Sequence, residues 1–152
     1  MKTYTLERET LLKHPPEKVF SFFEQPENLS RLTPPSMGFR ILTPSPVSMH
    51  TGAVIDYTVK ALGRRFHWRT LITDYRPPRE FVDVQLKGPY RLWHHTHLFE
   101  AHPEGTLMRD RVVYALPFGI AGRLVHALAV RKQLMKIFDY RKQMIKNLFD
   151  KN

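Results

Sequence analysis

The hydrophobic pattern of this chain begins with period two and then changes to a helical spacing. Residues 3–12 alternate between two kinds of position, and their weak apolar signal is typical of a strand at the edge of a sheet. Residues 15–26 begin with two prolines, continue with apolar side chains at helical spacing and end at a third proline, which predicts a short helix. A second short helix is expected over residues 27–32, where two further prolines end it.

A run of strands follows from Phe39 onward, where the period returns to two. The turn residues Gly63, Gly88 and Gly105 separate its segments and favour tight hairpins, so consecutive strands should pair antiparallel. The expected strands cover residues 39–41, 53–61, 65–72, 80–87, 92–101 and 106–116. The pattern therefore predicts an antiparallel meander.

The chain after Gly119 has helical periodicity to its end. Its apolar stripe is predicted to consist of Leu124, Leu128, Met135, Phe138, Ile145 and Phe149. An isolated amphipathic helix is unstable in water, and the strands offer the only large apolar face to cover it. We therefore expect an α+β fold, as one domain over residues 1–152, in which a curved antiparallel sheet of about six to seven strands wraps this helix and two short helices follow the first strand.

Composition narrows the possible classes of function. The chain has no cysteine, which excludes disulfides and thiolate chemistry, and no apolar run of about 20 residues, which argues against a membrane-spanning helix. Its N-terminus is charged where a signal peptide would be apolar, so a cytoplasmic location is expected. The net charge is +10, but the basic residues are scattered rather than interleaved with aromatic residues along one element. Nucleic-acid binding is therefore not expected.

Residues 81–119 carry a recognisable pattern, formed by Phe81, Asp83, Gln85, Gly88, Pro89, Trp93, His95, His97, Phe99, Gly105, Thr106, Asp110, Val112, Tyr114 and Pro117. With the order of elements, it resembles the START-like, or SRPBCC, superfamily of helix-grip (START/Bet v 1-like) proteins, and a bacterial ligand-binding branch described as polyketide cyclase/dehydrase-like. The resemblance implies a hollow between sheet and helix that accepts lipids, polyketides or other apolar molecules, without implying one reaction. Similar domains occur fused to oxidoreductase domains, which suggests a partner oxidoreductase. The chain has no dinucleotide-binding glycine motif, and no cofactor is expected.

Two histidines share one face of the strand expected over residues 92–101. Period two places His95 and His97 beside two aromatic side chains, and a short turn brings Asp110 onto the neighbouring strand. A carboxylate bonded to an imidazole would raise its basicity, as a general base requires. The three groups would otherwise satisfy one another inside the sheet, or bind a ligand. They also match a facial metal site, but His94 faces away and no further ligand motif appears, so no metal is predicted.

The predicted inner faces hold more polar residues than a dry core accepts, which favours a cavity. The expected ligand-binding residues are Tyr57, Trp68, Thr70, Asp83, Gln85, Trp93, His95, His97, Phe99, Asp110, Tyr114 and Arg141. Arg141 and Arg131 lie near the apolar stripe of the long helix, where either could pair with an acidic headgroup at the cavity mouth. A gate is expected at this mouth, formed by Phe118, Ile120 and Gly122 opposite Pro34, Pro35 and Met37.

The basic residues of the long helix allow two interpretations. Lys132, Lys136, Arg141, Lys142 and Lys146 form either a solvated face or a patch for weak contact with an anionic membrane. The leading hypothesis for function is the binding or carriage of an apolar small molecule without catalysis. The alternatives are a cyclase or dehydratase that uses a His/Asp pair, and a regulatory module for a partner enzyme. A monomer or weak dimer is expected, because charges on the first strand discourage edge pairing.

Overall fold

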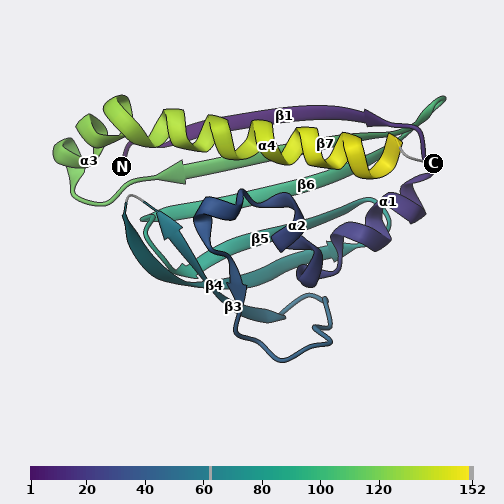
Figure 1. The fold of residues 1–152 in the computed structure, drawn as a ribbon, viewed down its shortest axis with the longest axis horizontal. Helices are drawn as coiled ribbons and strands as arrows, with labels where there is room; N and C mark the ends of the chain where they lie inside the picture. Colours follow the sequence, from purple (N-terminus) through teal and green to yellow (C-terminus); the bar gives the residue numbers. More distant parts are fainter. Residues whose placement is uncertain (62, 151–152) are drawn as a thin grey trace.

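The computed structural model describes residues 1–61 and 63–150, in which a seven-stranded antiparallel sheet curves around a long C-terminal helix (Figure 1). The strands are β1 (Tyr4–Leu12), β2 (Arg40–Ile41), β3 (Val54–Ala61), β4 (Arg64–Arg76), β5 (Glu80–Lys87), β6 (Leu92–His102) and β7 (Gly105–Ala115). Their order across the sheet is β1-β7-β6-β5-β4-β3-β2. Strands β2 to β7 thus form the predicted meander, and β1 pairs with the last strand. This helix-grip architecture confirms the expected fold class.

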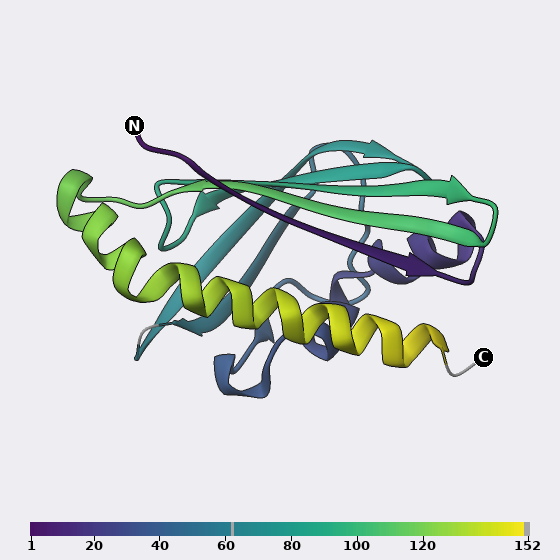
Figure 2. The same ribbon diagram turned by 90° about the horizontal axis from the view of Figure 1, so that it is seen from above.

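The helices lie on one face of the sheet (Figure 2). They are α1 (Pro16–Phe23), α2 (Leu29–Leu32), α3 (Gly119–Val125) and α4 (Arg131–Asp150), with 3-10 turns η1 (Pro26–Asn28) and η2 (Pro35–Met37) and a π-helical turn η3 (His126–Val130). The helix predicted over residues 27–32 is thus divided into η1 and α2, whereas α3, η3 and α4 run on as one rod. Within the described residues, none of these helices has the length and hydropathy needed to cross a bilayer.

The apolar face of the C-terminal rod differs from the predicted stripe. Leu134 and Phe138 are buried against the sheet, whereas Leu124, Leu128 and Met135 are exposed by 61, 69 and 40%. The prediction of these three as covered residues was wrong, whereas Phe138, Ile145 and Phe149 of the same stripe are buried as predicted. The π-helical turn η3 holds more residues than an α-helical turn, so the buried positions before α4 recur at every fourth residue and exclude Leu124 and Leu128.

A glycine fixes the tight connection between β6 and β7. Gly105 has φ 141°, and a Cβ atom there would collide with the backbone of Leu12 and His14 at the end of β1. We expect Gly105→Ala to lower the free energy of unfolding by about 2 kcal/mol in urea denaturation. Gly52→Ala is the matched control, since Gly52 also has a positive φ of 94° but an added Cβ meets no atom within 4 Å. An equal loss in both variants would contradict the proposed collision.

Candidate functional site

A cavity of about 190 Å³ lies between α4 and strands β3 to β6. Helix α4 contacts β1, and the segment from α1 to β2 closes the cavity beside it. The wall is mainly apolar, and it includes Phe22, Leu32, Met37, Phe39, Val59, Trp68, Trp93, Leu134, Ile137 and Phe138. Period two along the strands points one set of side chains toward the helix, which is why these residues meet there.

Most of the residues predicted to contact a ligand lie on this wall. They are Tyr57, Trp68, Thr70, Asp83, Trp93, His95, His97 and Arg141. The hydroxyl groups of Tyr57 and Thr70 lie 3.4 Å apart on neighbouring strands. Burial raises the pKa of Tyr57, and the nearby carboxylate of Asp83 adds to the effect, so this phenol stays neutral.

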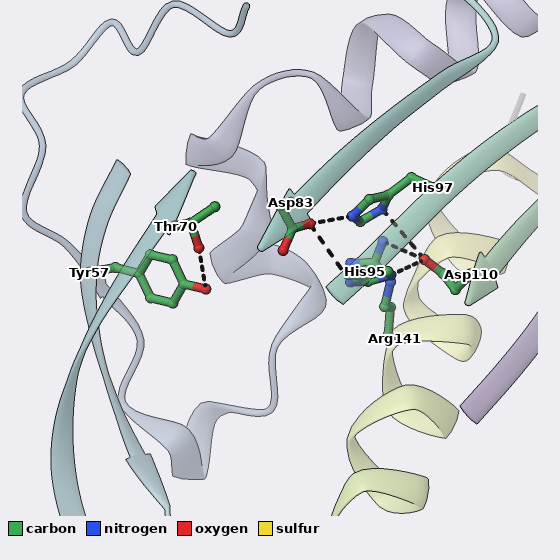
Figure 3. Close-up of polar contacts among 7 residues, drawn as sticks. All are labelled: Tyr57, Thr70, Asp83, His95, His97, Asp110 and Arg141. Atoms are coloured by element: carbon green, nitrogen blue, oxygen red, sulfur yellow. Dashed lines mark hydrogen bonds and ion pairs between the residues drawn. The ribbon is translucent and has the colours of Figure 1, made fainter. Parts of the chain in front are cut away.

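Two aspartates and two histidines form a closed cluster on the sheet side of the cavity (Figure 3). His95 Nε2 lies 2.8 Å from Asp110 Oδ1, and His97 Nε2 lies 2.6 Å from Asp83 Oδ2. The other ring nitrogens face the opposite carboxylates, with His95 Nδ1 3.9 Å from Asp83 Oδ2 and His97 Nδ1 3.5 Å from Asp110 Oδ1. The two rings stack with centroids 3.7 Å apart. Each imidazole therefore lies between two carboxylates.

Arg141 completes the cluster from the helix side. Its side chain is buried, its Nη2 donates to Asp110 Oδ1 at 3.3 Å, and its guanidinium packs 5.4 Å from the centre of the Phe23 ring. Burial alone would raise the pKa of Asp110, but the Arg141 charge and the hydrogen bond from His95 hold that pKa below its ordinary value. The interpretation of Arg141 as part of a solvated face or a membrane patch was wrong, because its side chain is buried and its ion pair with Asp110 turns it inward.

Asp83 is ionised for a related reason. Burial favours its neutral form, but the hydrogen bond from His97 and the charges around it lower its pKa. Burial also lowers the pKa of His97 to about 4, and His95 adds to this effect. Because a carboxylate only accepts, the proton of neutral His97 lies on Nε2, and Nδ1 is left as an acceptor.

Several buried nitrogen atoms on the wall have no hydrogen-bond partner within residues 1–61 and 63–150. They are Trp68 Nε1, His97 Nδ1 and Arg141 Nε. Buried polar atoms in proteins are nearly always paired, so atoms of this kind are unusual. The indole and guanidinium nitrogens are donors, and both belong to residues that line the cavity.

The cluster also resembles the donor set of a metal site. Ligand atoms of Asp83, His95 and His97 all lie within 4.8 Å of one another, whereas the set considered from the sequence contained Asp110 in place of Asp83. Arg141 argues against a cation here, because its charge already acts on Asp83 and would repel a second positive charge. The short bond from His97 to Asp83 also occupies the atoms that a metal would need. The geometry therefore favours an internal hydrogen-bond network.

Four residues predicted for ligand contact do not lie on the cavity wall. Asp110 lies behind the histidines, and Phe99 packs in the core cluster toward the end of α4. Gln85 forms two hydrogen bonds with the backbone of Tyr90 in the turn between β5 and β6. The Tyr114 hydroxyl lies 2.7 Å from His126 Nε2 under the C-terminal rod. These residues shape the site from behind or beside it.

The predicted gate is not formed. Met37 lines the cavity, but Phe118 and Ile120 are 84 and 80% exposed. Chain order suggested that they face η2, yet α3 leaves the sheet beyond the end of β7 and carries them away from it (Figure 2). Gly122 is buried, and a Cβ there would collide with the Pro117 carbonyl oxygen.

Some residues of the site were not identified from the sequence. Asp83 was expected to contact a ligand, but its bond to His97 was not predicted, because the backbone register places Asp83 opposite His95 and the bond runs diagonally from β5 to β6. Gln133 and Ile137 on α4 also line the cavity. Their spacing of four residues was a usable signal, but it was hidden by the incorrect stripe assignment.

Comparison with known proteins agrees with this architecture. The profile of a family described as polyketide cyclase / dehydrase and lipid transport matches residues 12–138. The chain belongs to this family. The match covers most of the fold, from the end of β1 to the middle of α4, and so includes the whole cluster except Arg141. No curated protein matches the chain.

Solved structures of this family's fold are similar over nearly the whole chain. TTHA0849 from Thermus thermophilus has a TM-score of 0.67 at 18% identity, covering 98% of this chain and 95% of that one. Ara h 8.0201 has a TM-score of 0.59 at 16% identity, covering 96 and 99%. The di-domain ARO/CYC StfQ from the steffimycin biosynthetic pathway has a TM-score of 0.73 at 12% identity, covering 98% of this chain and 51% of StfQ. These identities support a shared fold and nothing finer.

Proposed function

We propose that this protein binds a small, largely apolar molecule in the cavity and holds a neutral oxygen of that molecule beside the His/Asp/Arg cluster. The observation that carries the proposal is a mainly apolar wall that also holds the buried polar side chains of Asp83, His95, His97 and Arg141, with an unpaired donor on Arg141. Binding sites for small molecules have this composition. The volume of about 190 Å³ exceeds the roughly 150 Å³ of an engineered cavity that admits benzene, so one or two fused rings are the expected size.

The charge of the cluster supports a neutral ligand rather than an acid. Asp83 and Asp110 are ionised, His97 is uncharged at neutral pH, and Arg141 already pairs with Asp110. A ligand carboxylate would therefore be repelled by the carboxylates of Asp83 and Asp110, and the only guanidinium of the cluster already forms an ion pair with Asp110. A carbonyl or hydroxyl oxygen avoids this repulsion and still accepts from a free donor.

Naphthalene and 2-naphthol, which differ by one hydroxyl group, test both parts of the proposal. We expect 2-naphthol to bind about five- to tenfold more tightly than naphthalene, because one additional hydrogen bond contributes about 1 kcal/mol to the free energy of binding. Ile137→Trp should weaken both ligands because it fills the cavity, while Met135→Trp on the exposed face of the same helix should not. Fluorescence titration and native mass spectrometry measure the affinity and any ligand retained from mild purification. Equal binding by both tryptophan variants would contradict the proposal.

A cyclase or dehydratase is the second candidate, and one observation favours it. His95 lines the cavity and hydrogen-bonds Asp110, which is the orientation a general base needs. In an aldol cyclisation, His95 would take a proton from a carbon between two carbonyls, and that carbon would bond to a third carbonyl carbon. The new alkoxide would recover the proton before water is lost. Conversion of a poly-β-ketone by the purified protein, abolished in His95→Gln, would support this function over simple binding.

A regulatory role beside a partner enzyme is the remaining alternative. This role requires no small molecule in the cavity, whereas ligand binding and cyclase activity both do. Native mass spectrometry that finds only protein, together with a copurifying enzyme and no affinity for either naphthalene or 2-naphthol, would favour this alternative.

A further inference from the structure

An exposed apolar surface lies where β7 passes into α3. Phe118, Ile120, Leu124, Val125 and Leu128 are exposed by 84, 80, 61, 44 and 69%, and we call them the apolar tip. Figures 1 and 2 show α3 extending beyond the end of the sheet, so these residues belong to a projecting end of the C-terminal rod or to the turn before it. Single exposed apolar residues are common in proteins, but Ile120, Leu124 and Leu128 recur at every fourth residue of the rod and so lie on one face, and a group of this kind marks an interaction surface.

The backbone holds the tip in its exposed position. Phe118 has φ 69°, the only positive φ of a non-glycine residue in the described part of the chain. An aromatic residue adopts this left-handed conformation at a cost in free energy. Phe118 nevertheless adopts this conformation, in a turn that leaves its large aromatic side chain exposed to solvent. Burial against a partner surface would compensate for this cost.

The charges around the tip select the partner. Between Asp110 and Asp139 the chain has no acidic residue, and Arg123, Arg131 and Lys132 are all exposed within or beside the tip. A second copy of this chain, which also carries a net charge of +10, would be repelled. An apolar surface bordered by basic residues is complementary to a bilayer that contains anionic lipids.

We propose that the apolar tip docks this protein onto an anionic lipid bilayer, with the tip at the boundary between headgroups and acyl chains and the basic residues at the headgroups. The same rod lines the cavity a few residues further on, at Gln133 and Ile137. Docking would thus bring the cavity near the bilayer, from which apolar molecules can be collected. Docking itself requires no ligand, so its test is independent of the cavity proposal.

Flotation with vesicles tests the apolar part of the surface. The ligand-free protein should float with vesicles of phosphatidylcholine and phosphatidylglycerol, and far less with phosphatidylcholine alone. Phe118→Ser combined with Leu128→Ser should lower the partition coefficient by at least about tenfold, because two apolar side chains are lost from the contact. Leu42→Ser is the matched control, since Leu42 is another exposed apolar residue, at 53%, that lies outside the tip. All of these positions are exposed, so the variants are expected to fold.

Charge reversal tests the basic part. Arg131→Glu combined with Lys132→Glu should lower binding to anionic vesicles by about tenfold or more. Lys13→Glu with Lys18→Glu makes the same change in charge at exposed positions near α1, at the opposite end of the molecule (Figure 1). Equal losses in the two double variants, or no flotation of the wild type, would overturn the proposal. So would a concentration-dependent dimer that Phe118→Ser abolishes, because the tip would then be covered by a second copy.

Discussion

Arg141→Met is expected to lower the free energy of unfolding by about 3–5 kcal/mol at neutral pH, since it leaves buried carboxylates without their guanidinium partner. Arg141 and Asp110 each expose less than a tenth of their side chains and lie 3.3 Å apart. Methionine retains a flexible apolar stem of similar length that can still pack against Phe23. The expected loss therefore comes mainly from the charge, and urea denaturation measures it.

Two further variants separate this effect from general disturbance of the core. Asp110→Asn should recover part of the stability when it is combined with Arg141→Met, because the double variant buries one carboxylate fewer. Arg8→Met removes a guanidinium from an ion pair with Asp139 in which the aspartate is 66% exposed, and it should cost less than about 1 kcal/mol. A double variant as unstable as the sum of its single changes would show that the two side chains do not act as a pair.

The pH dependence of the same variant follows from Asp110. Its pKa in the folded protein is lowered from the ordinary value of 3.8, mainly by Arg141 acting against burial. The stability from this pair is therefore present above about pH 4 and is lost as the pH falls below it. The difference in the free energy of unfolding between the wild type and Arg141→Met should therefore become smaller as the pH falls below about 4. A constant difference from pH 7 to pH 3 would mean that charge is not the cause.

The predictable part of this molecule follows from short connections and simple periods. Alternation along β6 predicted that His95 and His97 share a face, and the tight turn at Gly105 predicted that β7 lies beside them. In the structure, the backbone of His97 on β6 lies directly opposite that of Asp110 on β7, and the side chain of His95 hydrogen-bonds the same aspartate. Local rules are sufficient here because the hairpin loop is too short to allow another register.

The unpredictable part depends on how distant elements rotate against one another. A single π-helical turn changes which residues of the C-terminal rod are buried, and it converts Leu124 and Leu128 from expected core residues into exposed ones. Arg141 lies on the buried face of α4 beside Phe138 and Ile145, but its charge did not indicate that a buried aspartate lies opposite it. The bond from His97 to Asp83 likewise runs diagonally between β6 and β5, because the residue directly opposite Asp83 is His95. None of these features is encoded in a pattern of neighbouring residues.

His97→Gln should remove much of the loss of stability that mild acid causes in the wild type. Burial lowers the pKa of His97 to about 4, against an ordinary value of 6.5. Between these two values the unfolded chain binds a proton at this position and the folded chain does not, so the free energy of unfolding falls as the pH falls. The difference in pKa corresponds to about 3 kcal/mol over this interval. Glutamine cannot titrate, but it retains a side-chain donor that can reach Asp83.

Urea denaturation at a series of pH values from 7 to 4 tests this expectation, with His94→Gln as the control. His94 lies on the same strand but points to the opposite, exposed face. Its replacement should therefore leave unchanged the slope of the free energy of unfolding against pH. A residual slope is expected in His97→Gln, because burial also lowers the pKa of His126. If His97→Gln and the wild type lose stability equally between pH 6.5 and pH 4, the pKa of His97 is not lowered in the folded protein and its imidazole becomes charged within this interval. The cluster would then gain a positive charge in mild acid, and an acidic ligand would become the better match for the cavity at that pH.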